Sequence, residues 1–339
     1  MPTTSRSLTQ RIARQLRIAA RFLIPRRDPS SRRVTSTTRP PQSATASRRR
    51  SRTGTGMLPA ALLLASAAQS VWGAAIYVDS RRGLDSLDGS TQTRVSQRSG
   101  PVRTLRRAMR VAGPGDRIVL TDNGTPYEAG LSLYGLQQSG SPSAPIEIVG
   151  NGCTISGAQQ VEPTAWQMVD DKVWRITPLR KGWYQLILNG EALPEVACPV
   201  DAAERPDLAE SQWCAYRGAF YFRPPAGKDP PDLPLQIAAE QTGLSFVAVE
   251  NVIVRDMIIE HFRQDGIHLH DRCRNITLEN VTCRQNGRAG IVVGGTSSVL
   301  LRGVVCEANR VDSLRVEDLA VADAEESTFD VRPTVQTLE

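Results

Sequence analysis

The chain has three histidines, and all of them lie within ten consecutive residues: His261, His268 and His270. Acidic and basic side chains stand beside them in the same stretch, HFRQDGIHLHDRC, namely Asp265, Asp271 and Arg272. An imidazole outside an apolar core titrates near neutral pH and is suited to proton transfer. This stretch is therefore the first candidate for chemistry, and the question is which fold brings these side chains together.

The stretch belongs to a sequence repeat with offsets of 24 and 23 residues. Its copies begin at Asn251, Asn275 and Ser298. Apolar residues recur at the same places in each copy, in pairs two residues apart, which is the period of a β-strand. The matched positions are Val252/Ile276/Val299, Val254/Leu278/Leu301, Met257/Val281/Val304, Ile259/Cys283/Cys306, Ile267/Ile291/Leu314 and Leu269/Val293/Val316. A repeat of this length built from short strands predicts a solenoid.

The pattern resembles the right-handed parallel β-helix of the pectate-lyase-like superfamily. The resemblance rests on the paired apolar residues and on polar corner columns, Asp256/Asn280/Gly303 and Asn286/Asn309, whose amides can bridge successive turns. It implies an all-β solenoid with an N-terminal capping helix and an irregular insertion. A second segment, QLILNGEALPEVACP from Gln185, resembles one in secreted β-helix proteins that act on glycans, but it lacks the arginine of their loop.

In such a coil Ile267 and Leu269 point inward, so His268 and His270 should point outward together. The copies should stack about 4.8 Å apart, the strand spacing of a sheet. Small residues in the middle copy would then leave a groove with charged banks. We expect catalytic roles for one set of residues and substrate binding by another: Asp265, His268, His270 and Asp271 for catalysis, and Arg272, Asp312 and Arg315 for binding.

The residues leave several reactions open. Asp265 and Asp312, two coils apart, could approach the roughly 6.5–9.5 Å carboxyl separation of an inverting glycoside hydrolase. A lyase would need histidine as its base, because the lysines all precede the regular coils: Lys172, Lys181 and Lys228. His268 and His270 with Asp271 could instead hold a metal ion, and calcium is left open, although no cofactor is expected. In the structural alternative, Asp265 with its following glycine only makes a turn and the histidines are solvated.

The formal charge of +6 comes from one end of the chain. Residues 1–56 hold 14 arginines, no lysine and one aspartate, so that the remainder carries 27 basic and 34 acidic residues, a net charge of −7. The basic composition therefore does not indicate nucleic-acid binding. Residues 1–56 have the composition of a disordered extension.

Residues 57–75, MLPAALLLASAAQSVWGAA, have a short apolar core followed by small residues, which is typical of a secretory signal peptide. Its apolar core is too short to span a bilayer comfortably. The sequence thus predicts a secreted, periplasmic or cell-surface monomer with no stable membrane insertion after cleavage.

The expected organisation of the remaining chain is a cap with the first coil (76–130), irregular coils with the insertion (131–250), regular coils (251–320), and a C-terminal cap or truncated end (321–339). PVRTLRRAMRVAGPGD should form the capping helix, because Leu105, Ala108 and Met109 fall at helical spacing. Most aromatic residues lie in the insertion. They should pack it onto the coils, with sugar stacking as the alternative.

The sequence therefore predicts an exported carbohydrate-active β-helix protein that degrades a polysaccharide as a glycoside hydrolase or a lyase. A non-catalytic carbohydrate-binding or cell-surface β-helix protein, and a truncated inactive relative, are the alternatives.

Overall fold

The computed structural model describes residues 73–128, 130–178 and 184–330. The basic extension, and residues 57–72 of the segment expected to be a signal peptide, lie outside these residues. The described part is built mainly of strands, and the one α-helix among the described elements is α2 (Leu105–Val111). No helix in these ranges is both long and apolar enough to cross a membrane.

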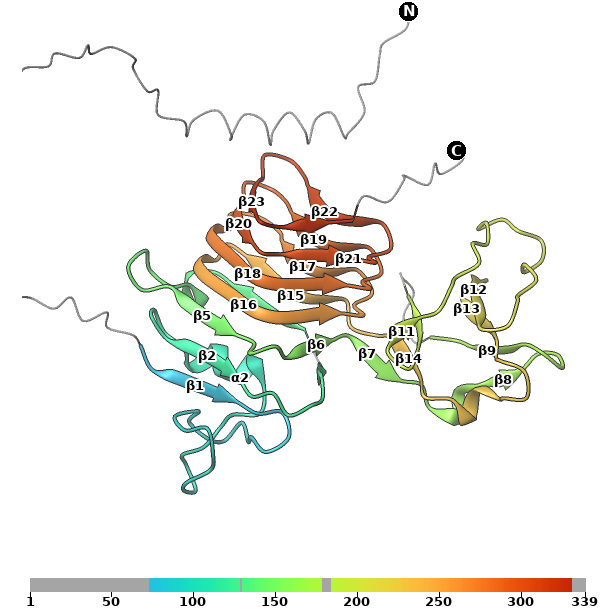
Figure 1. Ribbon diagram of the computed structural model, residues 1–339, viewed down its shortest axis with the longest axis horizontal. Coiled ribbons are helices and arrows are strands. Elements are labelled where there is room, and N and C mark those ends of the chain that lie inside the picture. Colours follow the sequence, from blue (N-terminus) through green and yellow to red (C-terminus); the bar gives the residue numbers. More distant parts are fainter. Residues whose placement is uncertain (1–72, 129, 179–183, 331–339) are drawn as a thin grey trace, which may run out of the picture. The chain divides into compact units, whose positions relative to one another are not determined.

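The repeat forms stacked parallel coils, as the spacing predicts (Figure 1). β16 (Glu250–Glu260) pairs with β18 (Arg274–Arg284) at an offset of 24 residues. β18 then pairs with β20 (Ser298–Arg302) and β21 (Val305–Glu307) at an offset of 23. Ile259, Cys283 and Cys306 stand in one inward column and are fully buried. The right-handed parallel β-helix is confirmed.

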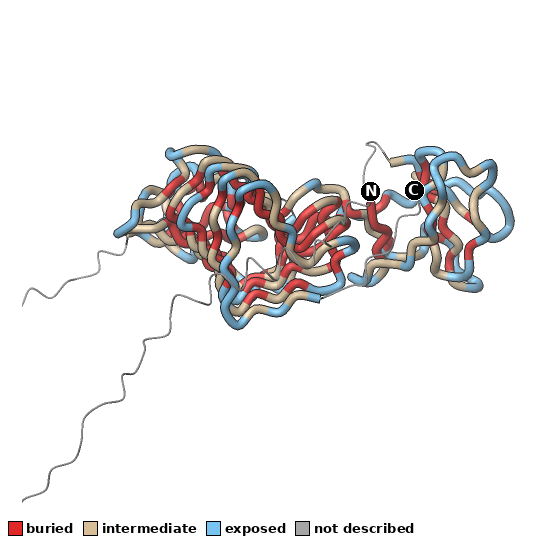
Figure 2. Tube along the Cα trace, turned by 90° about the horizontal axis from the view of Figure 1, so that it is seen from above, coloured by how far each residue is buried: buried red, intermediate tan, exposed pale blue. Residues whose placement is uncertain are grey.

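A second parallel sheet runs along another side of the coils. Its order is β22-β19-β17-β15-β4. These strands are β4 (Leu131–Tyr134), β15 (Thr242–Val247), β17 (Asp265–Leu269), β19 (Ala289–Val293) and β22 (Asp312–Val316). Alternate side chains of each strand enter the apolar core shared with the first sheet, and Figure 2 shows the buried stretches of successive coils lined up.

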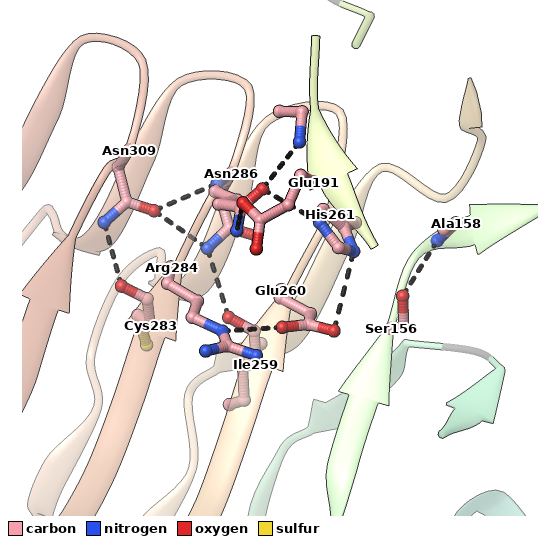
Figure 3. A network of polar contacts seen from close by, with 12 residues as sticks. Ser156, Ala158, Glu191, Ile259, Glu260, His261, Cys283, Arg284, Asn286 and Asn309 are labelled. Carbon is pink, nitrogen blue, oxygen red and sulfur yellow. Dashed lines mark hydrogen bonds and ion pairs between the residues drawn. The ribbon is translucent and has the colours of Figure 1, made fainter. Parts of the chain in front are cut away.

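Side-chain amides connect the coils at their corners. Asp256, Asn280 and Gly303 have positive φ values of 56°, 50° and 58°, which turns the chain sharply between two strand segments. Asn280 donates to Asp256 at 3.2 Å. At the next corner the buried Asn286 donates to Asn309 at 3.0 Å (Figure 3). The predicted amide bridges between coils are therefore present.

The first coils are closed by the predicted helix. Thr104 caps α2 by accepting from the Arg107 N–H at 3.1 Å, and Leu105, Ala108 and Met109 are buried in the main core. The strands of this region are β1 (Ala75–Val78), β2 (Arg117–Leu120), β3 (Tyr127–Glu128), β5 (Ile146–Val149) and β6 (Thr154–Ser156). A short 3₁₀ turn, η1 (Leu136–Gln138), follows β4.

The insertion leaves the coils after β6 and returns at β15, where the regular coils have only a four-residue corner between β16 and β17. It forms two antiparallel four-stranded sheets, in the orders β11-β10-β14-β7 and β12-β13-β9-β8. The first holds β7 (Ala158–Gln160), β10 (Leu186–Leu188), β11 (Glu191–Ala192) and β14 (Leu235–Ala238). The second holds β8 (Gln167–Met168), β9 (Trp174–Ile176), β12 (Gln212–Tyr216) and β13 (Ala219–Arg223); η2 (Pro163–Ala165) and η3 (Pro230–Asp232) complete the insertion.

The aromatic residues of the insertion mostly build a core of its own. Trp166, Tyr184, Trp213, Phe220 and Phe222 belong to one buried cluster, and Trp213 packs edge-on against Phe220 with ring centroids 5.1 Å apart. These buried rings offer no open face for sugar stacking, so packing is their main role.

The coils continue beyond the regular range expected from the sequence. β23 (Val321–Glu325) pairs with β20, and β24 (Thr328–Phe329) pairs with β21, again at an offset of 23 residues. Ala322 and Phe329 pack against the main core, whereas Ala324, in the column of the buried Leu301, is exposed. This sparse pattern explains why the sequence did not predict another coil here.

The buried amide ladder should contribute strongly to stability. Asn286 accepts from the Phe262 N–H at 3.1 Å and donates to the Ile259 carbonyl at 3.3 Å and to Asn309. Asn286→Leu keeps the branched shape of the side chain but leaves these groups unpaired, so we expect a loss of about 2–4 kcal/mol in the free energy of unfolding, measured by chemical denaturation.

The matched control is Asn280→Gly, which removes an exposed amide and tolerates the positive φ of 50°. Its effect should stay below about 1 kcal/mol. Equal losses of unfolding free energy in both variants would show that the buried amides stabilise the protein no more than the exposed ones.

Candidate active site

The candidate site is the outer face of the second sheet at β17, which we call the histidine face. Its side chains come from the outward columns of the stacked strands. The column of His268 continues as Ser245 on β15, Val292 on β19 and Arg315 on β22. The parallel register therefore sets the side chains of four successive coils in one row.

Asp265 lies at the base of this face and holds two partners. Its carboxylate oxygens accept from the Arg288 guanidinium, through Nε at 2.8 Å and through Nη2, and Oδ2 also accepts from His268 Nδ1 at 3.1 Å. The Asp265 side chain is fully buried, whereas 15% of the His268 side chain is exposed. Arg288 has 25% of its side chain exposed, so His268 and Arg288 are the members of this cluster that reach the surface.

The charge state of Asp265 follows from these contacts. Burial by itself would raise the pKa of Asp265, but the hydrogen bonds from His268 and Arg288 outweigh burial and hold the pKa below its ordinary value. The same hydrogen bond raises the pKa of Arg288. An ionised carboxylate only accepts hydrogen bonds, so His268 Nδ1 carries the proton of this contact, and in the neutral ring Nε2 carries the lone pair.

His270 lies against His268. The two rings stack with centroids 3.7 Å apart and an interplanar angle of 16°, and His270 Nε2 is 3.0 Å from the Ser245 hydroxyl. Burial lowers the pKa of His270, and the neighbouring His268 lowers it further. The His270 ring is therefore biased towards its neutral form.

Asp265 was expected to act as a direct catalyst, but its burial favours a different role. A fully buried carboxylate paired with Arg288 cannot touch a sugar, so the inverting-hydrolase arrangement of Asp265 with Asp312 is not supported. Asp265 instead fixes the orientation of His268, which makes it a positioning residue. A glycine follows it, because a Cβ at Gly266 would stand 2.7 Å from the Gly290 carbonyl oxygen of the next coil.

Asp271 and Arg272 lie at the corner after β17. Asp271 Oδ1 accepts from the Thr296 N–H at 2.9 Å and from its hydroxyl at 3.1 Å, which fixes the corner of the next coil. These hydrogen bonds also lower the pKa of Asp271. Arg272 is 70% exposed and stands 3.6 Å from Asp271. Asp271 thus has a structural role at this corner, and because half of its side chain is exposed, the catalytic role expected for it stays a prediction.

The same contacts argue against the metal alternative. The rings of His268 and His270 stack instead of converging on one point, and Asp271 is turned towards Thr296. Within the ranges that the structure describes, no three His, Cys, Asp or Glu side chains form a group that could hold a metal ion.

Arg315 is the cation at the other end of the row. Its Nε donates to Glu317 at 2.6 Å, and its Nη1 is 3.6 Å from Asp312. All three side chains are about 40% exposed. Arg315 and Asp312 therefore lie on the face predicted for substrate binding, with the buried Val292 between Arg315 and His268.

The sequence reasoning missed Arg288 and Ser245. Arg288 precedes β19 and reaches back one coil to Asp265. The sequence signal that could have identified Arg288 is its position at a corner, one repeat after Gln264 and therefore beside the column of Asp265. The third histidine, His261, lies elsewhere, buried at the corner between β16 and β17 and close to Gln285 at 3.2 Å.

The pH dependence of folding should report the Asp265 cluster. Because the pKa of Asp265 is lowered in the folded state, its stabilisation is fully present above the ordinary value of 3.8 and is lost as the pH falls through the folded value. Asp265→Asn should therefore be less stable than the wild type at pH 7, and the difference should shrink in acid. Denaturation at pH 7 and pH 3 measures both; a difference that grows in acid would contradict the assignment.

Comparison with known proteins agrees with the observed coils. Residues 236–332 match the family model described as a right handed beta helix region. The chain is similar to a solved glycoside hydrolase at 12% identity and a TM-score of 0.47, covering 69% of this chain and 66% of that one. It is also similar to pectate lyase Pel9A at 13% identity and a TM-score of 0.38, covering 76% and 54% of the two chains. A rhamnogalacturonan lyase gives 11% identity and a TM-score of 0.32, covering 74% and 56%.

The chain thus spans between about half and two thirds of the length of these three structures. No curated protein matches its sequence.

Proposed function

We propose that this right-handed parallel β-helix protein is exported and cleaves an acidic polysaccharide by β-elimination, with His268 as the base. The observation that carries the proposal is the contact of His268 Nδ1 with the buried, ionised Asp265. It leaves Nε2 as the proton acceptor on the outer, partly exposed side of the ring. A positioned imidazole with this tautomer is suited to remove a proton from carbon.

Elimination from a uronic acid residue needs a base and a cation. The base takes the proton from the carbon next to the carboxylate, the electron pair forms the new double bond, and the glycosidic oxygen leaves from the neighbouring carbon and is protonated. A guanidinium that binds the carboxylate stabilises the charge that develops there. Arg315 lies in the same column as His268 at a distance of two strand spacings, about 9.6 Å between backbones.

The residue between them suits a sugar ring. Val292 is buried and short, so it neither blocks nor charges the space above the row, and a ring placed there would have His268 on one side and Arg315 on the other. The longer contact of Arg315, 3.6 Å to Asp312, is the one that a substrate carboxylate would replace. Elimination requires no exposed pair of carboxylic acids, and the burial of Asp265 removes one member of the pair needed for hydrolysis.

A non-catalytic carbohydrate-binding module is the second candidate. Tyr134 on β4, in the same sheet, is 59% exposed, and an exposed aromatic ring on an open face suits sugar stacking. In that case the stacked histidines would bind the glycan without cleaving it.

His268→Ala should separate the two candidates. We expect turnover of an acidic polysaccharide, measured as ultraviolet absorbance of the unsaturated product, to fall by about 10²–10⁴-fold because the base is lost. The thermal midpoint should fall modestly, because Asp265 loses one hydrogen bond but keeps Arg288, so turnover is compared at a temperature where both proteins are folded.

The control is Thr277→Ala on β18, which changes a side chain of the other sheet and should leave turnover unchanged. Saturated products from the wild type would indicate hydrolysis. Binding without turnover in the wild type would support the binding module, whereas full turnover in His268→Ala would show that His268 is not the base.

Export is the second part of the proposal, and its support is the composition of residues 57–75, of which 57–72 lie outside the described residues. The first described strand, β1, begins at Ala75, the last residue of this segment. We expect N-terminal sequencing of the exported protein to find a first residue between Ala74 and Tyr77. An exported protein that retains residues 1–56 would contradict this part alone.

A further inference from the structure

A cavity of about 410 Å³ lies between the insertion and the corners of two coils, apart from the histidine face. The roughly 300–1,000 Å³ typical of small-ligand pockets includes this volume. Its polar lining comes from both parts of the chain: Gln185, Glu191, Glu195 and Trp213 from the insertion, and Gln285 and Arg310 from the coils. The proposed cleavage reaction uses none of these residues.

One amide holds the two walls of the cavity together. Gln285 Oε1 accepts from the Ala192 N–H at 2.8 Å and from His261 Nε2 at 3.2 Å, and Gln285 Nε2 donates to Glu191 at 3.1 Å. Figure 3 shows Glu191 and His261 at this corner of the coils. The buried third histidine thus fixes Gln285, and Gln285 fixes the Glu191 carboxylate at the cavity.

A charge pair forms a second connection. Arg310 Nη2 stands 2.7 Å from Glu195 Oε2, and only 19% of the Glu195 side chain is exposed. Burial raises the pKa of Glu195, and Arg310 partly offsets this. The polar groups of the cavity are therefore held in place before any ligand arrives, which lowers the entropy cost of binding.

An unpaired side-chain oxygen of Gln185 indicates that the cavity binds a ligand. Its side chain is on the cavity wall, the residue is 7% exposed, and its buried Oε1 has no hydrogen-bond partner among the described residues. Its backbone carbonyl accepts from the Ala238 N–H at 3.1 Å, so the residue itself is anchored in the insertion. A buried amide oxygen without a partner is costly, and a turn of this amide towards the cavity would let a ligand hydroxyl relieve that cost.

We propose that this cavity binds a neutral sugar residue. Sugar hydroxyls both donate and accept, so they can satisfy the amide and carboxylate oxygens of Gln185 and Glu191 as well as the guanidinium of Arg310. Two carboxylates against one guanidinium disfavour an anionic ligand. The apolar side chains of Leu193 and Pro194 and the edge of Trp213 supply contact for the carbon side of the ring. The inference does not rest on cleavage at the histidine face.

The test is calorimetric titration of the folded protein with a panel of neutral disaccharides of glucose, galactose, mannose and xylose. At least one should bind, and Gln185→Leu should weaken it about tenfold or more, because the acceptor is lost. The same variant should keep or raise the thermal midpoint, because it removes an unpaired buried oxygen. A purely structural glutamine would instead lower the midpoint.

Two controls separate this cavity from other surfaces. Gln160→Leu changes an exposed glutamine of β7 outside the cavity and should bind the sugar as the wild type does. His268→Ala should also bind it unchanged, so that failure of the cleavage proposal leaves this one standing. The inference is overturned if no panel sugar binds the wild type, if Gln185→Leu binds normally or loses stability, or if only His268→Ala loses binding.

Discussion

The backbone ladder between successive coils is the constraint on which the rest of the structure depends. Each strand of a coil is hydrogen-bonded to the same strand one coil away, at offsets of 24 and 23 residues along the chain. Inward positions are occupied by the core, as in the column of Ile259, Cys283 and Cys306. Only outward and corner side chains are left for chemistry, and the register sets them in rows about 4.8 Å apart.

The histidine face depends on one consequence of that register. A buried carboxylate is unfavourable unless it is paired, and Asp265 is paired by an arginine from the next coil, Arg288. Loss of either partner would leave an uncompensated buried charge. The same pair determines which nitrogen of His268 faces outward, so the stability of the corner and the chemistry of the imidazole depend on the same contacts.

The sequence predicted the coils well because the strand period can be read from a few neighbouring residues and the same pattern recurs in each copy of the repeat. The inward columns, the amide ladder of Asn286 and Asn309, and the outward direction of His268 all follow from them. The role of Asp265 did not follow, because its partner Arg288 lies at a corner, where side-chain direction is not set by the period of two. The contact of Asp271 did not follow for the same reason: its partner, Thr296, lies in the next corner.

The insertion was harder to predict. Its strands are short and antiparallel, and its packing on the coils depends on Gln285, Glu195 and Arg310, none of which belongs to a local motif. The cavity with the unpaired Gln185 oxygen arises only when these two parts of the chain meet.

The central claim is that Asp265 holds His268 with its Nε2 lone pair facing outward. Nitrogen NMR of ¹⁵N-histidine-labelled protein tests it directly, and three histidines make the spectrum assignable. In the neutral ring of His268, the account predicts a protonated Nδ1 and an unprotonated Nε2, with this preference lost in Asp265→Asn. A proton on Nε2 in the wild type, or the same tautomer in both proteins, would contradict it.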